Sequence, residues 1–252
     1  MKMTVIGCSG SYPGPDSPAS CYLLEAEQEG RVWRILLDLG NGALGALQRF
    51  VDPLVIDAVL ISHLHADHCM DLCGYYVLRK YHPAGAATQI PVWGPEGAAD
   101  RMALAYDLPL DPGMTAEFDF RAYPTQSFTV GPFTIDAILV EHPVAAYAVR
   151  VSADGRVLTY SGDTGPCEAL DRASSGADLL LAEASFVEGA DNPPSLHLTG
   201  KDCGETATRS AVGRLVLTHI PPWHDRAVCL DEARSAYDGP IELAATGATF
   251  VV

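Results

Sequence analysis

The sequence predicts an α/β protein, and three observations support this class. Short apolar runs typical of strands dominate the first third of the 252 residues, and strands alternate with helical segments afterwards. Polar residues repeatedly follow the ends of the strands. Neither a sequence repeat nor a low-complexity linker interrupts the chain, so we expect residues 1–252 to form one domain.

The N-terminal part of the chain should begin with three strands and a loop. The run from Gly10 to Pro18 consists of turn-forming residues and is too long for a simple hairpin, so we expect it to line a site. The turn Gln28-Glu29-Gly30 separates the second strand from the third. The three strands are Thr4–Cys8, Cys21–Glu25 and Trp33–Asp38.

Strands and helices alternate in the remainder. Asp154-Gly155 predicts a hairpin turn, and Thr199 and Asp202 have the spacing of a capping box before a helix. Residues 107–132 contain only short strand-like pieces. The other expected strands are Asp57–Ser62, Pro91–Pro95 (strand and turn), Phe133–Val140, Ala146–Val151, Arg156–Tyr160, Leu179–Ala182, Leu215–Leu217, Ile241–Ala245 and Thr249–Val252. The expected helices are Ala43–Phe50, one that begins at Asp67, Glu96–Tyr106, Cys167–Ser174, Cys203–Val212 and Ala227–Tyr237.

Composition limits the class of protein. With 48% hydrophobic and 19% charged residues, the chain can bury a large core, and disorder is not expected. No apolar run approaches 18 residues and no signal-peptide pattern is present, so we expect a cytoplasmic protein that does not enter a membrane. The seven cysteines are scattered and odd in number, which favours reduced thiols.

The acidic balance argues against a long nucleic acid as ligand. The chain has 32 Asp and Glu but only 16 Lys and Arg, giving a formal charge of −16. Polynucleotide binding depends on cationic side chains that replace condensed counterions, and few are available here. Two divalent cations would reverse the charge locally, so a small anion could still bind.

Residues 59–68 predict a metal site. A buried strand ends at Ser62, and three histidines and an aspartate follow it. Because alternate side chains of an extended segment share a face, His63 and His65 can bind one cation. Asp67 and His68 fall at the start of a helix and can reach a second. Imidazole and carboxylate ligands suit Zn²⁺, with Mn²⁺ or Fe²⁺ as alternatives.

Three later residues occupy equivalent positions. His142, Asp163 and His219 each follow an apolar strand-like run, so they can meet at the same edge of a sheet. His142 could complete the ligands of one metal and His219 those of the other. Asp163 could bridge the two ions, as two-metal hydrolysis requires.

These residues resemble a known family. His63-Leu-His-Ala-Asp-His68 is similar to the H-x-H-x-D-H signature of the metallo-β-lactamase superfamily, and the later ligand motifs match in order. The resemblance covers essentially the whole chain and implies a four-layer αβ/βα sandwich with a dinuclear site at the sheet edge. It implies one metal on His63, His65 and His142 and a second on Asp67, His68 and His219, with Asp163 bridging.

Two further motifs resemble the ribonuclease Z branch, which includes phosphodiesterases. They are Glu183-Ala-Ser-Phe and His197-Leu-Thr-Gly. The resemblance implies that His197 contacts the scissile phosphate and that Glu183 orients His197; with Asp67 they are the expected catalytic residues. By its sequence context alone, His197 would be an exposed loop residue. Only 20 residues separate His142 from Asp163, which leaves no room for an arm that grasps tRNA.

The segments 7–11, 14–20, 161–165 and 217–223 resemble actinobacterial atypical cyclic-nucleotide phosphodiesterases. The implied reaction is hydrolysis of 3′,5′-cAMP to 5′-AMP by a hydroxide held between the metals. Ser9, Ser11 and Trp223 are candidate substrate contacts, although Trp223 could instead cover the core. Ribonuclease Z-like relatives form dimers, but nothing in this sequence itself indicates an interface, so the choice between a monomer and a homodimer stays open.

Three rival functions remain for this sequence. They are a tRNA 3′-end endonuclease, an ester, thioester or lactone hydrolase on the same scaffold, and a metal-stabilised binding module without activity.

The cysteines Cys69 and Cys73 beside the metal motif are interpreted as apolar filler, and His82 as an exposed residue. His224 shares a loop with His219.

Overall fold

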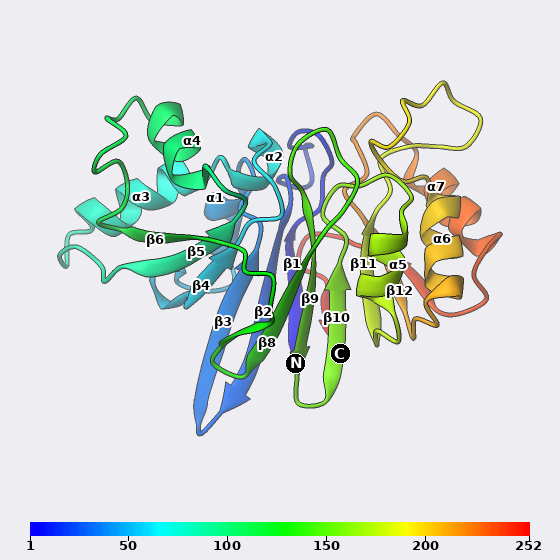
Figure 1. The fold of residues 1–252 in the computed structure, drawn as a ribbon, viewed down its shortest axis with the longest axis horizontal. Coiled ribbons are helices and arrows are strands. Elements are labelled where there is room, and N and C mark those ends of the chain that lie inside the picture. The colour runs from blue at the N-terminus through cyan, green and yellow to red at the C-terminus, as the bar shows by residue number, and fades with distance from the viewer.

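The computed structural model describes residues 1–252 and shows two seven-stranded sheets packed face to face. Helices cover the outer face of each sheet, so the layers run helix, sheet, sheet, helix (Figure 1). The expected αβ/βα sandwich is confirmed.

The first sheet contains the N-terminal strands and the last strand of the chain. β1, β2 and β3 pair antiparallel, whereas β3 to β6 run parallel. In spatial order the strands are β14 (Thr249–Val251), β1 (Lys2–Gly7), β2 (Cys21–Gln28), β3 (Arg31–Leu37), β4 (Ala58–Leu60), β5 (Ile90–Gly94) and β6 (Phe118–Ala122). Its helices are α1 (Ala43–Leu47), α2 (Ala66–Cys69), α3 (Leu72–Tyr81) and α4 (Ala98–Ala105), with a 3₁₀ turn at Pro53–Val55.

The second sheet contains the remaining strands. β10 to β13 run parallel, and β7, β8, β9 and β10 pair antiparallel in succession. In spatial order they are β13 (Ile241–Leu243), β12 (Leu215–Thr218), β11 (Leu179–Glu183), β10 (Arg156–Tyr160), β9 (Tyr147–Ala153), β8 (Phe133–Leu139) and β7 (Phe128–Val130). The helices on its outer face are α5 (Glu168–Ser174), α6 (Gly200–Arg209) and α7 (Arg226–Arg234).

Side-chain alternation along the strands divides the core into three layers. In β3, Ile35 and Leu37 pack between the sheets, whereas Leu36 packs toward the helices. In β12, Val216 faces the layer between the sheets and Leu215 faces the outer helices. Because these strands bury both faces, their sequences are continuous apolar runs rather than alternating ones.

The helix expected after the metal motif is divided in two. α2 ends at Cys69 and α3 begins at Leu72. Between them, the Asp71 N–H donates to the Leu39 carbonyl, 3.1 Å away, and its carboxylate accepts from the Leu44 N–H at 2.8 Å. These hydrogen bonds connect the interruption between α2 and α3 to the segment that follows β3. The spacing of apolar residues in 67–81 contains no information about them.

The capping box before α6 is confirmed. The Thr199 hydroxyl accepts from the Asp202 N–H at 3.1 Å, and the Asp202 carboxylate accepts from the Thr199 N–H at 2.9 Å. The helix therefore begins at Gly200, three residues before the expected start at Cys203. The other helices and strands lie at the expected positions, with ends that differ by a few residues.

Strand direction places the loops that carry the candidate ligands together. β8, β10, β11 and β12 all end at one edge of the second sheet. In the first sheet, β4 ends toward α2, which lies at the upper edge of the sandwich in Figure 1. Both sheets thus deliver polar side chains to a common edge. No helix has the length and apolar character needed to cross a bilayer.

Candidate metal centre

Seven side chains from the two halves of the sandwich meet at this edge. The loop after β4 and helix α2 contribute four of them, and loops after β8, β10 and β12 contribute one each. Their ligand atoms form two groups, each with all atoms within 4.8 Å of one another. The groups are His63, His65, His142 and Asp163, and Asp67, His68, Asp163 and His219. All seven residues predicted as metal ligands are brought together.

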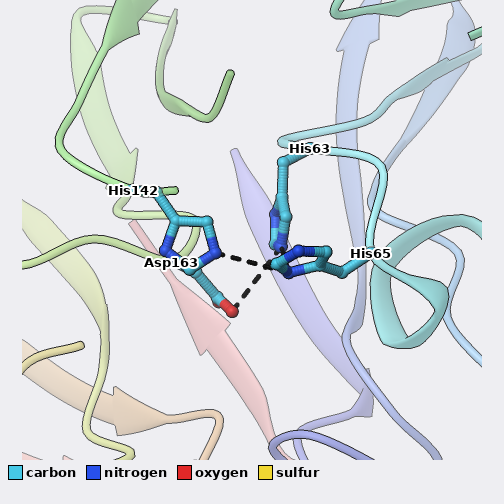
Figure 2. A group of neighbouring side chains, drawn as sticks. All are labelled: His63, His65, His142 and Asp163. Carbon is cyan, nitrogen blue, oxygen red and sulfur yellow. Dashed lines mark hydrogen bonds and ion pairs between the residues drawn. The ribbon is translucent and has the colours of Figure 1, made fainter. Parts of the chain in front are cut away.

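The first group is compact enough to hold one cation (Figure 2). His65 Nδ1 lies 3.0 Å from His63 Nε2 and 3.3 Å from His142 Nε2. Asp163 Oδ2 lies 3.7 Å from His63 Nε2. Four donors bound to one Zn²⁺ in a tetrahedron, with bonds of about 2.0–2.1 Å, would lie about 3.3 Å from one another. The observed spacing fits this arrangement.

Hydrogen bonds behind the rings determine which nitrogens carry protons. His142 Nδ1 donates to the Leu196 carbonyl, 3.0 Å away. Ser62 Oγ donates to Asp38 and can therefore accept from His63 Nδ1 at 3.1 Å. The Nε2 atoms of both histidines are left with lone pairs directed into the group, a repulsive arrangement unless a cation lies among them. Burial lowers the pKa of His63 and His142, which favours the neutral form that binds metal.

The second group shares Asp163 with the first. His219 Nε2 lies 3.1 Å from His68 Nε2 and 3.0 Å from Asp67 Oδ2. Asp163 Oδ1 lies 3.3 Å from His68 Nε2, whereas its other oxygen faces His63 in the first group. One carboxylate therefore offers one oxygen to each group, as a ligand that bridges two ions must.

Asp163 also tests whether cations fit the centre. Its side chain is 3% exposed, and Oδ1 is buried without a hydrogen-bond partner. Burial raises the pKa of Asp163, but His219, His68 and His63 outweigh this effect and lower it well below its usual range. An ionised oxygen buried without a hydrogen bond is costly, and the groups nearest to it are the Nε2 atoms of His68 and His219, at 3.3 and 3.5 Å, which are themselves predicted metal ligands. Two divalent cations would satisfy it, so the donor set fits the metals that the sequence implies.

Asp38 supports the second group and was not identified from the sequence. Its Oδ2 accepts from His68 Nδ1 at 2.7 Å, Ser62 Oγ at 2.8 Å and the Tyr160 hydroxyl at 2.8 Å. This fixes the His68 tautomer and leaves Nε2 free for a metal. Burial lowers the pKa of His68, but the charges of Asp163 and Asp38 raise it well above its usual value. The same negative field would attract a cation.

Asp38→Asn should weaken metal binding about 10- to 100-fold without unfolding the protein. An amide at this position cannot accept from three donors and would leave the His68 tautomer undefined. Affinity can be measured by competition with a chromophoric chelator, and the fold by circular dichroism. Asp119→Asn is the matched control, since this carboxylate is exposed on β6 beside Arg121. Wild-type metal affinity in the Asp38 variant would contradict the role assigned to it.

Ser185 holds His219 in a similar way. Its hydroxyl donates to the His219 carbonyl at 2.9 Å and accepts from His219 Nδ1 at 2.7 Å. His219 has a left-handed backbone, with φ of 53°, a conformation that costs about 1–3 kcal/mol in a residue other than glycine. The two contacts to Ser185 therefore stabilise both the strained backbone and the ring orientation.

A buried carboxylate and a histidine lie beside the second group. Glu183 Oε1 accepts from His197 Nδ1 at 2.8 Å and from the Thr164 N–H at 3.1 Å, and Oε2 accepts from the Ser185 N–H at 3.0 Å. The His197 ring lies 5.8 Å from that of His219. Its side chain is only 14% exposed, so His197 is not the exposed loop residue that its local sequence suggests.

The pair of Glu183 and His197 differs electrostatically from the predicted ligands of the first group. Burial lowers the pKa of His197, but the charge of Glu183 and its hydrogen bond outweigh burial and raise the pKa to about 9. This interaction with Glu183 favours the imidazolium form of His197 at neutral pH. Because Nδ1 is engaged by Glu183, Nε2 carries the proton available for donation.

The candidate substrate contacts lie on two loops beside the centre. Ser9 is buried, and its hydroxyl donates to the Tyr12 carbonyl at 2.8 Å. Ser11 is exposed, and its backbone N–H lies 3.4 Å from His219 Nε2. Trp223 is 61% exposed, so it does not cover the core. Direct contact of these residues with substrate stays a prediction.

The remaining candidates lie outside the two groups. All seven cysteines are free thiols. Cys69 is buried and its thiol donates to the His65 carbonyl at 3.2 Å, while Cys73 is half-buried, and neither belongs to a ligand group. His82 is half-buried rather than exposed, and so is His224.

Gly40 allows the loop after β3 to approach the metal loop closely. A Cβ at this position would lie 1.9 Å from the Asp67 carbonyl oxygen. We expect Gly40→Ala to displace Asp67, to lower metal affinity and to destabilise the fold by about 1–3 kcal/mol. Gly45→Ala in α1 is the control, because nothing lies within 4 Å of its added Cβ. It should retain metal and gain about 0.5–1 kcal/mol. Metal titration measures the metal affinity of both variants, and thermal unfolding measures their stability. Equal affinity and equal stability in Gly40→Ala and Gly45→Ala would contradict the crowding at Gly40.

Comparisons with known proteins identify the family of this chain. The family model of the beta-lactamase superfamily domain matches residues 33–220. An uncharacterized protein of Mycobacterium leprae is 42% identical over 99% of this chain and 88% of its own length. The probable metallo-hydrolase YhfI of Bacillus subtilis is 29% identical over 98% of both chains. Ribonuclease Z of Myxococcus xanthus is 25% identical over 99% of this chain and 97% of its own.

Solved structures show the same architecture. The crystal structure of YhfI from Bacillus subtilis matches with a TM-score of 0.86 and 28% identity over 99% of both chains. Yeast PDE1 matches with a TM-score of 0.76 over 100% of this chain and 99% of its own, at 14% identity, which shows a shared fold alone.

Proposed function

This chain belongs to the metallo-β-lactamase superfamily, and from that premise we propose that it is a phosphodiesterase for a small cyclic nucleotide. It is a metal-dependent hydrolase of this superfamily, with relatives and structural neighbours of the ribonuclease Z and phosphodiesterase type. The proposed reaction converts 3′,5′-cAMP to 5′-AMP with two Zn²⁺ ions bound.

The observation that carries this proposal is the pair of Glu183 and His197 beside the metal centre. With two divalent ions bound, the imidazolium of His197 would add a third positive group beside them, with its Nε2 proton not engaged by Glu183. A phosphodiester carries a negative charge before and throughout its hydrolysis, whereas a neutral ester or lactone does not. The third positive group therefore favours the phosphodiester.

The chain's own groups have distinct roles in this reaction. When bound, the two divalent ions would supply Lewis acidity and lower the pKa of a water molecule toward neutrality. Asp163 would hold the two ion sites together, and Asp67 would take the proton that the attacking water gives up, roles that their distances to the neighbouring ligands support. His197 would donate its Nε2 proton to a phosphate oxygen or to the departing 3′ oxygen, while Glu183 keeps the ring oriented and charged.

The region between His142 and Asp163 supports a small substrate. It consists of the β9–β10 hairpin, whose strands pair from Ala153 with Arg156 to Val149 with Tyr160. The turn of this hairpin lies at the edge of the sandwich away from α2 (Figure 1), so no arm extends from this segment beside the metal centre. A long RNA would have to bind without it and without a basic surface.

A substrate panel tests the proposal. Protein loaded with Zn²⁺, and separately with Mn²⁺, is assayed with cAMP, cGMP, bis-p-nitrophenyl phosphate, precursor tRNA and simple lactones. We expect kcat/KM to be highest for a cyclic nucleotide. Faster cleavage of precursor tRNA, with binding that weakens steeply as salt rises, would establish the endonuclease instead. Activity confined to lactones or esters would exclude both phosphodiester functions.

A further inference from the structure

An exposed aromatic pair lies on the two loops that flank His219. Tyr12 is 44% exposed and Trp223 is 61% exposed, and their ring centroids are 5.4 Å apart with an interplanar angle of 33°. Exposed tryptophan is unusual because its large apolar surface is normally buried. These two side chains cover each other only in part and present an open aromatic face to solvent.

Short connections join this pair to the metal centre. The Ser11 N–H lies 3.4 Å from His219 Nε2, and Tyr12 is the next residue, so its Cα is about 3.8 Å from that of Ser11. Trp223 lies four residues after His219. The Gly10 N–H donates to the Ile220 carbonyl at 3.2 Å, which links the two loops.

The loop that carries Tyr12 is held by its own hydrogen bonds. Ser9 Oγ donates to the Tyr12 carbonyl at 2.8 Å, and the Gly14 N–H donates to the Ser17 carbonyl at 2.9 Å. A preorganised aromatic surface loses little conformational entropy when a ligand stacks on it. The pair is therefore suited to binding rather than to filling space.

Most cationic side chains are engaged in ion pairs. Ten of the 16 Lys and Arg residues are already in ion pairs with carboxylates. Aromatic stacking is an uncharged contact that this edge offers and that every base can use. We propose that Tyr12 and Trp223 form a platform on which the base of a nucleotide substrate stacks, an inference that rests on the proposed function.

The spacing of the rings assigns their roles. A base inserted between two aromatic rings needs them about 7 Å apart, two contact distances of about 3.5 Å, and these are closer. The base therefore stacks on the free face of Trp223, while Tyr12 supports the opposite face as a positioning residue. A cavity of about 200 Å³ beside Pro222 is lined by Asp16, His224 and Arg226, whose polar groups could contact the edge of the base.

The test compares a nucleotide with a substrate that has no base. For metal-loaded protein, kcat and KM are measured with cAMP and with the abasic 3′,5′-cyclic phosphate of 1-deoxyribose. Trp223→Ala should raise KM for cAMP about 5- to 150-fold and reduce the preference for cAMP over the abasic compound by the same factor. Trp223→Phe should recover part of this loss. Tyr12→Ala should show a smaller increase, and Tyr81→Ala, at an exposed tyrosine in α3, serves as the matched control.

The outcomes separate this inference from the proposed function. If the protein hydrolyses cAMP and Trp223→Ala behaves like Tyr81→Ala, the platform is excluded while the function stands. If the protein hydrolyses no cyclic nucleotide, the function fails, and tryptophan fluorescence during titration with 5′-AMP decides about the platform. Quenching that disappears in Trp223→Phe would support it, and the absence of quenching in the wild-type protein would overturn it.

Discussion

Asp163→Ala is expected to remove at least one of the two metal ions and to lower kcat by at least about 10³-fold. Asp163 is the one ligand shared by both groups, and each of its oxygens faces a different group. Its loss therefore affects both cation positions at once. The number of bound ions per chain can be measured by elemental analysis, alongside turnover of the best substrate from the panel.

Two controls make the Asp163 result specific. Asp119→Ala removes an exposed carboxylate from β6 and should retain two ions and full turnover. Circular dichroism of the Asp163 variant should show that its sheets still form, because the side chain lies at the edge of the sandwich and belongs to none of the apolar core clusters. Two ions and undiminished turnover in Asp163→Ala would rule out the dinuclear centre.

His197→Ala should lower kcat by about 10²- to 10⁴-fold while both metal ions stay bound. His197 belongs to neither of the two groups assigned to the ions; it forms a third cluster with Glu183 and His219, in which Glu183 accepts its Nδ1 hydrogen bond. Its proton should matter most when the leaving oxygen is a poor leaving group. The loss is therefore expected to be large with cAMP and small with bis-p-nitrophenyl phosphate, whose nitrophenolate leaves without protonation.

His82→Ala is the matched control for His197, since this half-buried histidine follows α3 and belongs to neither ligand group. An equal loss with both substrates would assign His197 to phosphate binding rather than to proton donation. An unchanged kcat with cAMP would exclude any part for it in catalysis.

The fold class and the layer order could be predicted because the strands bury both faces. Runs such as Leu179-Leu180-Leu181 are apolar throughout, and helical segments follow them at regular intervals. The break between α2 and α3 could not be predicted, because it depends on contacts from Asp71 to Leu39 and Leu44, which come from another part of the chain.

The ligand set could be predicted for a related reason. Each of its motifs follows a strand, and strands of one direction end at one edge, so local sequence was sufficient. Asp38 and Ser185 could not be identified from the sequence, because their role is to form hydrogen bonds with the ligand histidines His68 and His219. Asp38 contacts Tyr160, 122 positions away in the chain, and Ser185 contacts His219 across 34 positions. Nothing in the sequence around either residue records those partners.

The division of the ligands between the two sheets has a thermodynamic consequence. Four of the seven residues belong to the half of the molecule built on the first sheet, and three belong to the half built on the second. Bound ions would cross-link the two halves. By mass action, one ion at a free concentration of 100 Kd adds about 2.7 kcal/mol to the stability of the folded state. Depleting the metal should therefore loosen the joint between the halves as well as stop hydrolysis.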